Sequence, residues 1–230
     1  MKLAVIPARG GSKRIPRKNV KSFAGRPMIA YAIEAARASG CFDRILVSTD
    51  DEEIAQVAVA YGAEVPFRRP ASLADDHTPT VPVVAHAITE MASLDLPPPV
   101  DVCCIYPGVP LLAPSDLARA YGMLRQAGSA YVFPVIAFPS AIQRALKRRP
   151  DGLSAPFHPE YADTRTQDLE RAYYDAGQFY WGSAETWAKG LALHTNALTI
   201  VVPGHEAIDI DTPGDWHRAE ALYALLKRRR

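Results

Sequence analysis

A glycine-rich segment near the start of the chain has the composition of an anion-binding loop. Residues 3–19 read LAVIPARGGSKRIPRKN, an apolar run followed by glycines and basic residues. Gly10 and Gly11 would let backbone N–H groups come close to an anion, and Ser12 would add a hydroxyl donor. The spacing matches neither the P-loop pattern GxxxxGKS/T nor GxGxxG. The segment therefore predicts phosphate chemistry of another kind, with a structural basic turn as the alternative.

The distribution of charge favours the same interpretation. Residues 1–26 hold eight Lys or Arg and no Asp or Glu, whereas the whole chain has a formal net charge of +1, so the remaining residues carry −7. Such a concentration attracts an anion to one place and argues against a nucleic-acid partner spread over the whole surface. Arg9, Lys13 and Lys18 together could balance the charge of roughly −4 on a nucleoside triphosphate. A solvated basic loop is the alternative.

Two aspartates near the other end of the chain have the spacing of a metal-binding pair. Asp209 and Asp211 are two residues apart, so in an extended segment both carboxylates lie on the same side. Two carboxylate oxygens suit Mg²⁺ that is bound together with a phosphate-bearing substrate. Asp211 or Thr212 could instead cap a helix that starts at Pro213. That alternative leaves Asp209 unexplained.

Alternating strands and helices must position these residues. The pattern predicts a three-layer α/β/α fold with a mostly parallel sheet. Ligands in such folds bind at the carboxyl ends of the strands, where the basic loop falls. Asp50 and Asp51 also follow a strand, and we interpret them mainly as helix-capping residues. Strands are expected at 2–6, 44–48, 64–67, 100–106, 130–136 and 198–202, and helices at 27–39, 51–61, 80–91, 115–127 and 213–226.

One stretch, from about 138 to 187, breaks this alternation and is rich in aromatic residues. We expect a single domain over residues 1–230 with an excursion at about 138–187. The excursion could be a small subdomain, a dimer arm or a lid over a ligand. Its aromatic residues are expected mainly in the core or in dimer contacts rather than stacked on a sugar.

Composition excludes several other classes of protein. The 230 residues are 48% hydrophobic and 22% charged, which is ordinary for a globular protein, and no apolar run approaches the ~20 residues needed to cross a bilayer. Cys41, Cys103 and Cys104 lack CxxC spacing, which predicts reduced core thiols in a cytoplasmic protein. The scattered histidines disfavour a zinc enzyme. No membrane partner is expected.

Seven motifs together resemble the CMP-sialic acid synthetase group, the acylneuraminate cytidylyltransferase family. The first motif marks the wider family, and those after residue 140 are most similar to its pseudaminic acid cytidylyltransferase branch. The resemblance runs nearly end to end. The motifs are IPARGGSKRIPRKN (6–19), VSTDDEEIA (47–55), GAEVPFRRP (62–70), IQRAL (142–146), TRTQDL (164–169), DAGQFYWG (175–182) and DIDT (209–212).

The resemblance implies a reaction and a set of site residues. CTP and a 2-keto-3-deoxy nonulosonic acid would give a CMP-sugar and pyrophosphate with Mg²⁺, on a nucleotide-diphospho-sugar transferase fold that is usually a homodimer. Asp209 and Asp211 would hold the metal, and Lys13, Lys18 and Asp211 would be catalytic. The residues implied for CTP are Arg9, Gly10, Gly11, Ser12, Lys13, Lys18, Asn19, Arg69 and Thr80, and those for the sugar are Gln143, Gln167, Asp175, Gln178 and Tyr180.

One loop departs from the family pattern. A Thr-containing loop similar to YATAPF is expected where this chain reads IYPGVPL at 105–111, and Pro107, Gly108 and Val109 supply no hydroxyl. The alternatives are therefore kept open. They are cytidylyl transfer to a sialic, legionaminic or eight-carbon keto-deoxy acid, a glycosyltransferase that uses a preformed nucleotide sugar, and a non-catalytic nucleotide-binding subunit.

Overall fold

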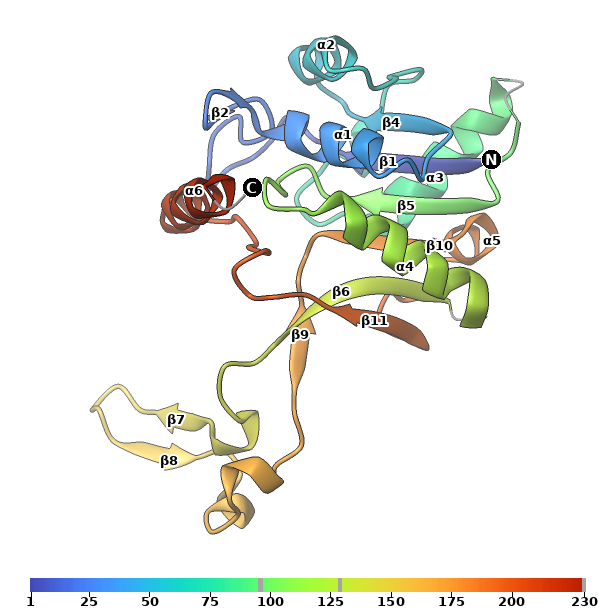
Figure 1. The fold of residues 1–230 in the computed structure, drawn as a ribbon. Helices are drawn as coiled ribbons and strands as arrows, with labels where there is room; N and C mark the ends of the chain where they lie inside the picture. The colour runs from blue at the N-terminus through green and yellow to red at the C-terminus, as the bar shows by residue number, and fades with distance from the viewer. Residues whose placement is uncertain (95–96, 128–129, 229–230) are drawn as a thin grey trace.

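A seven-stranded mixed sheet forms the centre of the protein (Figure 1). The structure is a computed structural model that describes residues 1–94, 97–127 and 130–228. The strand order is β11-β6-β10-β5-β1-β4, and β9 pairs with β6. The strands are β1 (Lys2–Pro7), β4 (Arg44–Ser48), β5 (Asp101–Ile105), β6 (Tyr131–Ala137), β9 (Tyr173–Asp175), β10 (Phe179–Ser183) and β11 (Ala197–Val201).

Five of the seven strands, β1, β4, β5, β6 and β11, run in the same direction, as the prediction of a mostly parallel sheet requires. β1 pairs in parallel with β4 and with β5, and β11 pairs in parallel with β6. β10 runs antiparallel between β5 and β6, and β9 is antiparallel to β6. The strand expected at 64–67 is not formed: Glu64 makes only an isolated bridge to Leu46. Val65, Pro66 and Phe67 instead begin the irregular segment that leads toward α3.

Helices cover both faces of the sheet, which confirms the three-layer arrangement. Alternate residues of β1 separate the two cores: Ala4 and Ile6 pack in one, Leu3 and Val5 in the other. Helices α1, α2 and α4 contribute to the first core, and α3 and α5 contribute to the second. The helices are α1 (Met28–Ala38), α2 (Glu52–Ala60), α3 (Thr80–Ser93), α4 (Pro114–Ala127), α5 (Ala184–Ala188) and α6 (Pro213–Lys227).

A third apolar cluster attaches the last helix to the start of the chain. Trp216 of α6 packs edge-on against Phe23, which belongs to the short hairpin β2 (Ser22–Phe23) and β3 (Arg26–Pro27). Thr212 and Asp215 form a capping box at the first turn of α6. This packing brings the segment with Asp211 beside the basic loop that precedes the hairpin.

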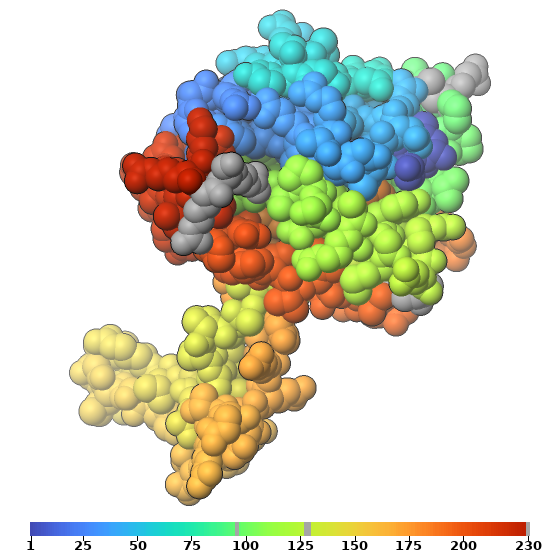
Figure 2. All heavy atoms as spheres, viewed as in Figure 1, coloured from blue at the N-terminus to red at the C-terminus, as the bar shows by residue number. Residues whose placement is uncertain are grey.

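An arm leaves the sheet after β6 and returns to it at β9 (Figure 1, Figure 2). It contains the hairpin β7 (Leu146–Arg148) and β8 (Ser154–Pro156) and three single 3₁₀ turns, at Ile142–Arg144, Pro159–Tyr161 and Thr166–Asp168; another 3₁₀ turn, Ala71–Leu73, precedes α3. The excursion expected at about 138–187 is therefore shorter in the structure, spanning 138–172. Strand β10 and helix α5, which the expected range included, belong to the body.

The three cysteines are buried and free, as predicted. Cys103 and Cys104 are neighbours in β5 and lie in the two different cores, because successive side chains of a strand point to opposite faces. No helix among the described residues is long and apolar enough to cross a membrane.

The centre of the sheet leaves no room for a side chain at Gly182 of β10. A Cβ there would lie 2.8 Å from Cδ1 of Tyr131 and 3.0 Å from Nε1 of Trp187. We expect Gly182→Ala to lower the free energy of unfolding by about 1–3 kcal/mol, the usual cost of overpacking a core. The matched control is Gly122→Ala in α4, where a Cβ meets no atom within 4 Å.

That control should leave stability unchanged or raise it by up to ~1 kcal/mol, because alanine favours an exposed helix over glycine. Urea denaturation followed by circular dichroism measures both variants. Equal stability of Gly182→Ala and the wild type would contradict this description of the sheet centre.

Candidate active site

A polar cavity of about 480 Å³ opens at the carboxyl ends of β1 and β5. It brings together eight of the residues that the sequence predicts for CTP or the metal, from three separate segments. Its lining consists of Pro7, Arg9, Ser12, Lys13, Arg14, Lys18 and Asn19, then Leu73, Asp75, Asp76 and Thr78 with Arg69, Thr80 and Val83, then Tyr106 and Pro107, and finally Asp211.

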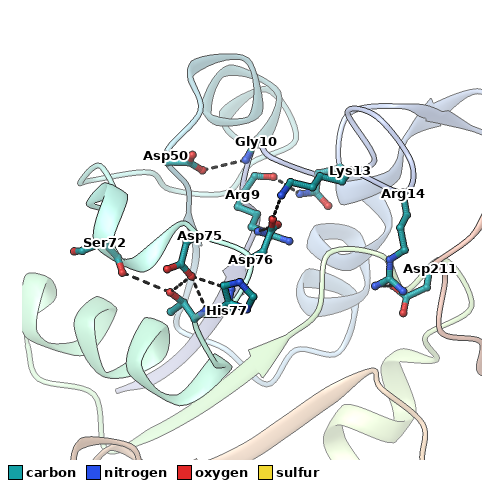
Figure 3. A network of polar contacts seen from close by, with 12 residues as sticks. Arg9, Gly10, Lys13, Arg14, Asp50, Ser72, Asp75, Asp76, His77 and Asp211 are labelled. Atoms are coloured by element: carbon teal, nitrogen blue, oxygen red, sulfur yellow. Dashed lines mark hydrogen bonds and ion pairs between the residues drawn. The ribbon is translucent and has the colours of Figure 1, made fainter.

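Two cations of the basic loop meet at one carboxylate (Figure 3). Arg9 Nη1 lies 2.5 Å from Asp76 Oδ1, and Lys13 Nζ contacts the other oxygen of the same carboxyl. Hydrogen bonds from Lys13 and then from Arg9 lower the pKa of Asp76. Asp76 was not predicted, because it lies in a loop without periodicity, although the adjacent acidic residues Asp75 and Asp76 shortly after Arg69 are a signal in the sequence.

Lys18 reaches the opposite wall of the cavity. Its Nζ donates to the carbonyl oxygen of Ile210 at 2.6 Å and lies 3.7 Å from Oδ1 of Asp211. Arg14 also pairs with that oxygen, at 2.9 Å (Figure 3). A Cβ at Gly108 would lie 4.0 Å from Cε of Lys18. The loop that departs from the family pattern therefore lies beside Lys18.

Asn19 is buried and has an unused hydrogen-bond acceptor. It is 5% exposed, and its Nδ2 donates to the carbonyl oxygen of Arg9 at 2.9 Å. Among the described residues its Oδ1 has no partner. An amide oxygen accepts hydrogen bonds, so this atom suits a hydroxyl donor of a ligand better than a phosphate oxygen.

The backbone of the loop is held from outside the cavity. The N–H of Gly10 donates to Oδ1 of Asp50 at 3.0 Å, so this donor already has a protein acceptor (Figure 3). A Cβ at Gly11 would meet no atom within 4 Å. Neither glycine is among the cavity-lining residues, although both were predicted to contact CTP.

A hydrogen-bonding wall faces the basic loop. Arg69 is 4% exposed; its Nε donates to Oγ of Ser48 at 3.1 Å, and its Nη2 contacts the carbonyl oxygen of the same residue. Burial lowers the pKa of Arg69 to about 10, so the guanidinium stays charged at neutral pH. Thr80 Oγ1 lies 2.8 Å from the hydroxyl of Tyr106, whose pKa is raised to about 12 by burial. This wall can read a polar planar group.

The two aspartates predicted to hold a metal are close enough to affect one another. Partial enclosure by protein atoms and then the charge of Asp211 raise the pKa of Asp209, although the residue is exposed as a whole. Asp211 lines the cavity; Asp209 lies against Gly177, where a Cβ would be 3.7 Å from its Cγ. Of the two candidate helix caps, Asp211 and Thr212, the N-cap of α6 is Thr212, whose side chain accepts from the N–H of Asp215.

The chemistry of this pair fits part of a metal site, as the sequence predicts. The described residues contain no group of three or more His, Cys, Asp or Glu that could hold a metal ion by themselves. Two repelling carboxylates with hard oxygen donors fit a divalent cation that takes its other ligands from a phosphate-bearing substrate and water. Asp209 and Asp211 are therefore suited to a metal that arrives with the substrate.

Three of the residues implied for the sugar are bonded to neighbouring protein groups. Asp175 accepts from the hydroxyl of Tyr180 at 2.7 Å and from the N–H of Gly177 at 2.8 Å. Gln178 is 2% exposed and donates from Nε2 to the carbonyl oxygen of Glu206 at 3.1 Å. Tyr180 packs edge-on against Tyr106 with ring centres 5.5 Å apart. This group supports the cavity wall from behind.

The other two, Gln143 and Gln167, lie on the arm and not among the residues that line the cavity. Gln143 donates from Nε2 to the carbonyl oxygen of Glu170 at 3.0 Å. Gln167 lines a separate cavity at the base of the arm. Within one chain the structure does not bring these two glutamines to the basic loop.

Solved structures of other proteins share this α/β architecture. The chain of a CMP:2-keto-3-deoxy-manno-octonic acid synthetase complexed with CTP superposes with a TM-score of 0.72 and 20% sequence identity, covering 98% of this chain and 99% of that one. A 4-diphosphocytidyl-2C-methyl-D-erythritol synthase from Anaerococcus prevotii superposes with a TM-score of 0.64 and 13% identity, covering 99% and 98% of the two chains. At these identities the likeness shows the fold.

Sequence relatives are more specific. A family model described as cytidylyltransferase matches residues 3–177. A pseudaminic acid cytidylyltransferase of Campylobacter jejuni is 41% identical over 97% of this chain and 96% of its own length. A CMP-N,N'-diacetyllegionaminic acid synthase of Legionella pneumophila is 33% identical over the same shares. The chain belongs to the cytidylyltransferase family of nucleotidyltransferase enzymes.

Replacing Asp209 or Asp215 by asparagine should change the melting temperature at neutral pH in opposite directions. A raised pKa means that ionised Asp209 opposes folding, so Asp209→Asn should raise the melting temperature at neutral pH, and the gain should vanish as pH falls below the range in which aspartate titrates. Hydrogen bonds from Thr212 lower the pKa of Asp215. Asp215→Asn should therefore lower the melting temperature at neutral pH, and this loss should shrink as pH falls.

Thermal melts of both variants and the wild type between pH 3 and pH 8 measure the difference. A loss of stability in Asp209→Asn at neutral pH would contradict the repulsion between Asp209 and Asp211.

Proposed function

We propose that the protein transfers CMP from CTP to the anomeric hydroxyl of a nonulosonic acid, with pseudaminic acid as the acceptor and Mg²⁺ as the metal. The observation that carries this proposal is the convergence of Arg9, Lys13, Lys18 and Asp211 on one cavity. The relatives named for pseudaminic and legionaminic acids support the class of acceptor. The reaction needs CTP, and we place it in the cytoplasm.

Charge positions the triphosphate in this proposal. Arg9 and Lys13, which share Asp76 in the structure, bind the β- and γ-phosphates, and the hydroxyl of Ser12 adds a donor. Lys18, on the opposite wall, stabilises the charge that grows on pyrophosphate as it leaves in line. Positioning and electrostatics dominate such a reaction, because little covalent work falls to the protein.

Asp209 and Asp211 would hold Mg²⁺ in this scheme. A bound Mg²⁺ supplies Lewis-acid polarisation of the α-phosphate and a lower pKa for the attacking hydroxyl. Arg14 and Lys18 hold the carboxylate of Asp211 at the edge of the cavity through their ion pairs with it.

The nucleoside would lie against the polar wall. The unused Oδ1 of Asn19 accepts from a ribose hydroxyl, and Arg69, Thr80 and Tyr106 border the cytosine. Cytosine carries a donor amino group where uracil has an acceptor, so a buried hydrogen-bonding site can reject UTP strongly.

We infer a homodimer built through the arm. Most of the large exposed apolar side chains of the described residues lie on or beside it: Phe138, Ile142, Leu146, Leu153, Phe157, Tyr161, Tyr173 and Tyr174. A projecting arm with this surface suits burial against a second copy (Figure 2). Gln143 and Gln167 would then bind the sugar from the partner's arm, and Asp175, Gln178 and Tyr180 would support that side of the cavity.

Crossing nucleotides with acceptors tests the reaction. We expect pyrophosphate release with CTP and pseudaminic acid in Mg²⁺, with a rate for UTP, ATP or GTP at least a hundredfold lower. Chelation with EDTA should stop the reaction. The acceptor panel includes sialic, legionaminic and eight-carbon keto-deoxy acids.

Pyrophosphate release with CTP and a different acid would support the proposed mechanism and contradict pseudaminic acid as the acceptor. If folded protein binds CTP but none of the acids supports pyrophosphate release, the proposed activity is refuted in favour of a non-catalytic nucleotide-binding subunit. In that case the loop at 106–111 is the first place to look.

Loss of Lys18 should affect turnover rather than folding. We expect Lys18→Ala to lower kcat roughly 10²–10³-fold, by analogy with removal of one donor that stabilises a developing negative charge. The control is Lys189→Ala, whose ion pair with Glu185 lies on the exposed surface at the end of α5. Steady-state pyrophosphate release, with thermal melting alongside, distinguishes the two. Turnover within threefold of the wild type for Lys18→Ala would exclude its assigned role.

A further inference from the structure

We propose that Arg17 is a positioning residue of the reaction, acting through Asp51 to hold the basic loop in its phosphate-binding shape. The inference rests on the proposed function, since it concerns how Lys18 and Asn19 are placed. Arg17 itself is not among the residues that line the cavity. It acts from outside, and nothing in its residue type alone predicts this role.

The backbone at Arg17 is held in an unfavourable conformation. Its φ is +55°, in the left-handed region that favours glycine. A non-glycine residue stays there only where surrounding contacts determine the conformation, and such positions concentrate at functional sites. The carbonyl oxygen of Arg17 accepts from the N–H groups of Val20 at 3.0 Å and Lys21 at 2.9 Å. The turn that carries Lys18 and Asn19 therefore begins at this residue.

The contact that holds the conformation is a two-point ion pair. Nη1 of Arg17 lies 2.5 Å from Oδ2 of Asp51, and Nη2 lies 2.9 Å from Oδ1. Nη2 also contacts Glu53. Asp51 is fixed in turn, because its Oδ1 accepts from the N–H of Ile54 at 3.0 Å as the N-cap of α2. The guanidinium thus ties the loop to the first turn of a packed helix.

The same carboxylate also borders the other end of the loop. A Cβ at Gly10 would lie 2.7 Å from Oδ2 of Asp51. The N–H of Gly10 donates to Oδ1 of Asp50, the residue before Asp51 in the chain. Asp51 therefore sits between Gly10 and Arg17, and the segment from 10 to 17 closes on one carboxyl group. The Arg17 hydrogen bonds lower the pKa of Asp51 to about 2, so the pair stays ionised at neutral pH.

Closure of this segment sets the positions of the groups that bind phosphate. Lys18 and Asn19 follow Arg17 directly, and Lys13 lies inside the closed segment. Groups that stabilise a transition state act only when their geometry is fixed beforehand, and a displacement of about 1 Å can cost on the order of 10²-fold in rate. Arg17 and Asp51 supply that rigidity without touching the substrate.

The test compares two arginines that make similar ion pairs. Arg17→Gly removes the guanidinium and at the same time relieves the left-handed backbone, so the variant should fold. The control is Arg44→Ala: Nε of Arg44 lies 2.9 Å from Oε1 of Glu64, and Nη2 contacts the other oxygen, but Arg44 lies at the start of β4, away from the cavity. Both changes remove a bidentate arginine–carboxylate pair.

We expect Arg17→Gly to lower kcat at least tenfold with a melting temperature within a few degrees of the wild type, whereas Arg44→Ala keeps kcat within twofold. Added guanidinium ion at millimolar concentration should restore part of the kcat of Arg17→Gly. It should not rescue the double variant Arg17→Gly/Asp51→Asn, which lacks the carboxylate that would bind it. A kcat for Arg17→Gly within twofold of the wild type would overturn the proposal, as would a fall in kcat equal to that of Arg44→Ala.

The role of the Arg17–Asp51 ion pair can fail independently of the proposed function, and a second measurement distinguishes the two failures. If none of the acceptors supports pyrophosphate release by the wild type, the affinities of the wild type and the two variants for inorganic pyrophosphate are compared by calorimetry. Arg17→Gly should then bind pyrophosphate at least tenfold more weakly than the wild type, and Arg44→Ala should bind it equally well. Equal pyrophosphate affinity of Arg17→Gly and the wild type would overturn the positioning role proposed for Arg17.

Discussion

Repulsion among crowded cations is the constraint on which the rest of this site depends. The loop after β1 concentrates basic residues on a short segment, and the proposed binding of a triphosphate requires each of them to stay close to its neighbours. The protein offsets the repulsion with acids from other parts of the chain. Asp76 lies between Arg9 and Lys13, Asp51 and Glu53 contact Arg17, and Asp211 faces Arg14 and Lys18. These carboxylates lie in the loop before α3, at the start of α2 and in the segment before α6.

Local signals in the sequence were sufficient for much of the architecture. The strand at 44–48 and the helices begun at Thr80 and Pro213 form where periodicity and capping residues predict them. Strand β10 was not predicted, because it is buried on both faces and follows the arm, so its residues show no alternation. Its antiparallel place between β5 and β6 depends on pairing between segments far apart in sequence, and no local pattern encodes that.

The site could be predicted in part, for a similar reason. Residues of the basic loop, Arg69, Thr80 and Asp211 are single-segment signals, and the fold brings them to one cavity. Asp51 was interpreted as a helix cap; it is one, and it also binds Arg17, which only tertiary structure reveals. Gln143 and Gln167 lie in motifs that resemble the family's, but the arm that carries them leaves the body, so the role proposed for them requires the proposed second copy.

In the proposed function, the triphosphate of CTP occupies the space between Arg9 and Lys13, where Asp76 lies in this structure. A crystal structure of the protein with CTP and Mg²⁺ tests it most directly. We predict that the phosphates contact Arg9, Lys13 and Lys18, and that both ion pairs of Asp76 are broken. A triphosphate bound elsewhere, with Arg9 and Lys13 still paired to Asp76, would contradict it.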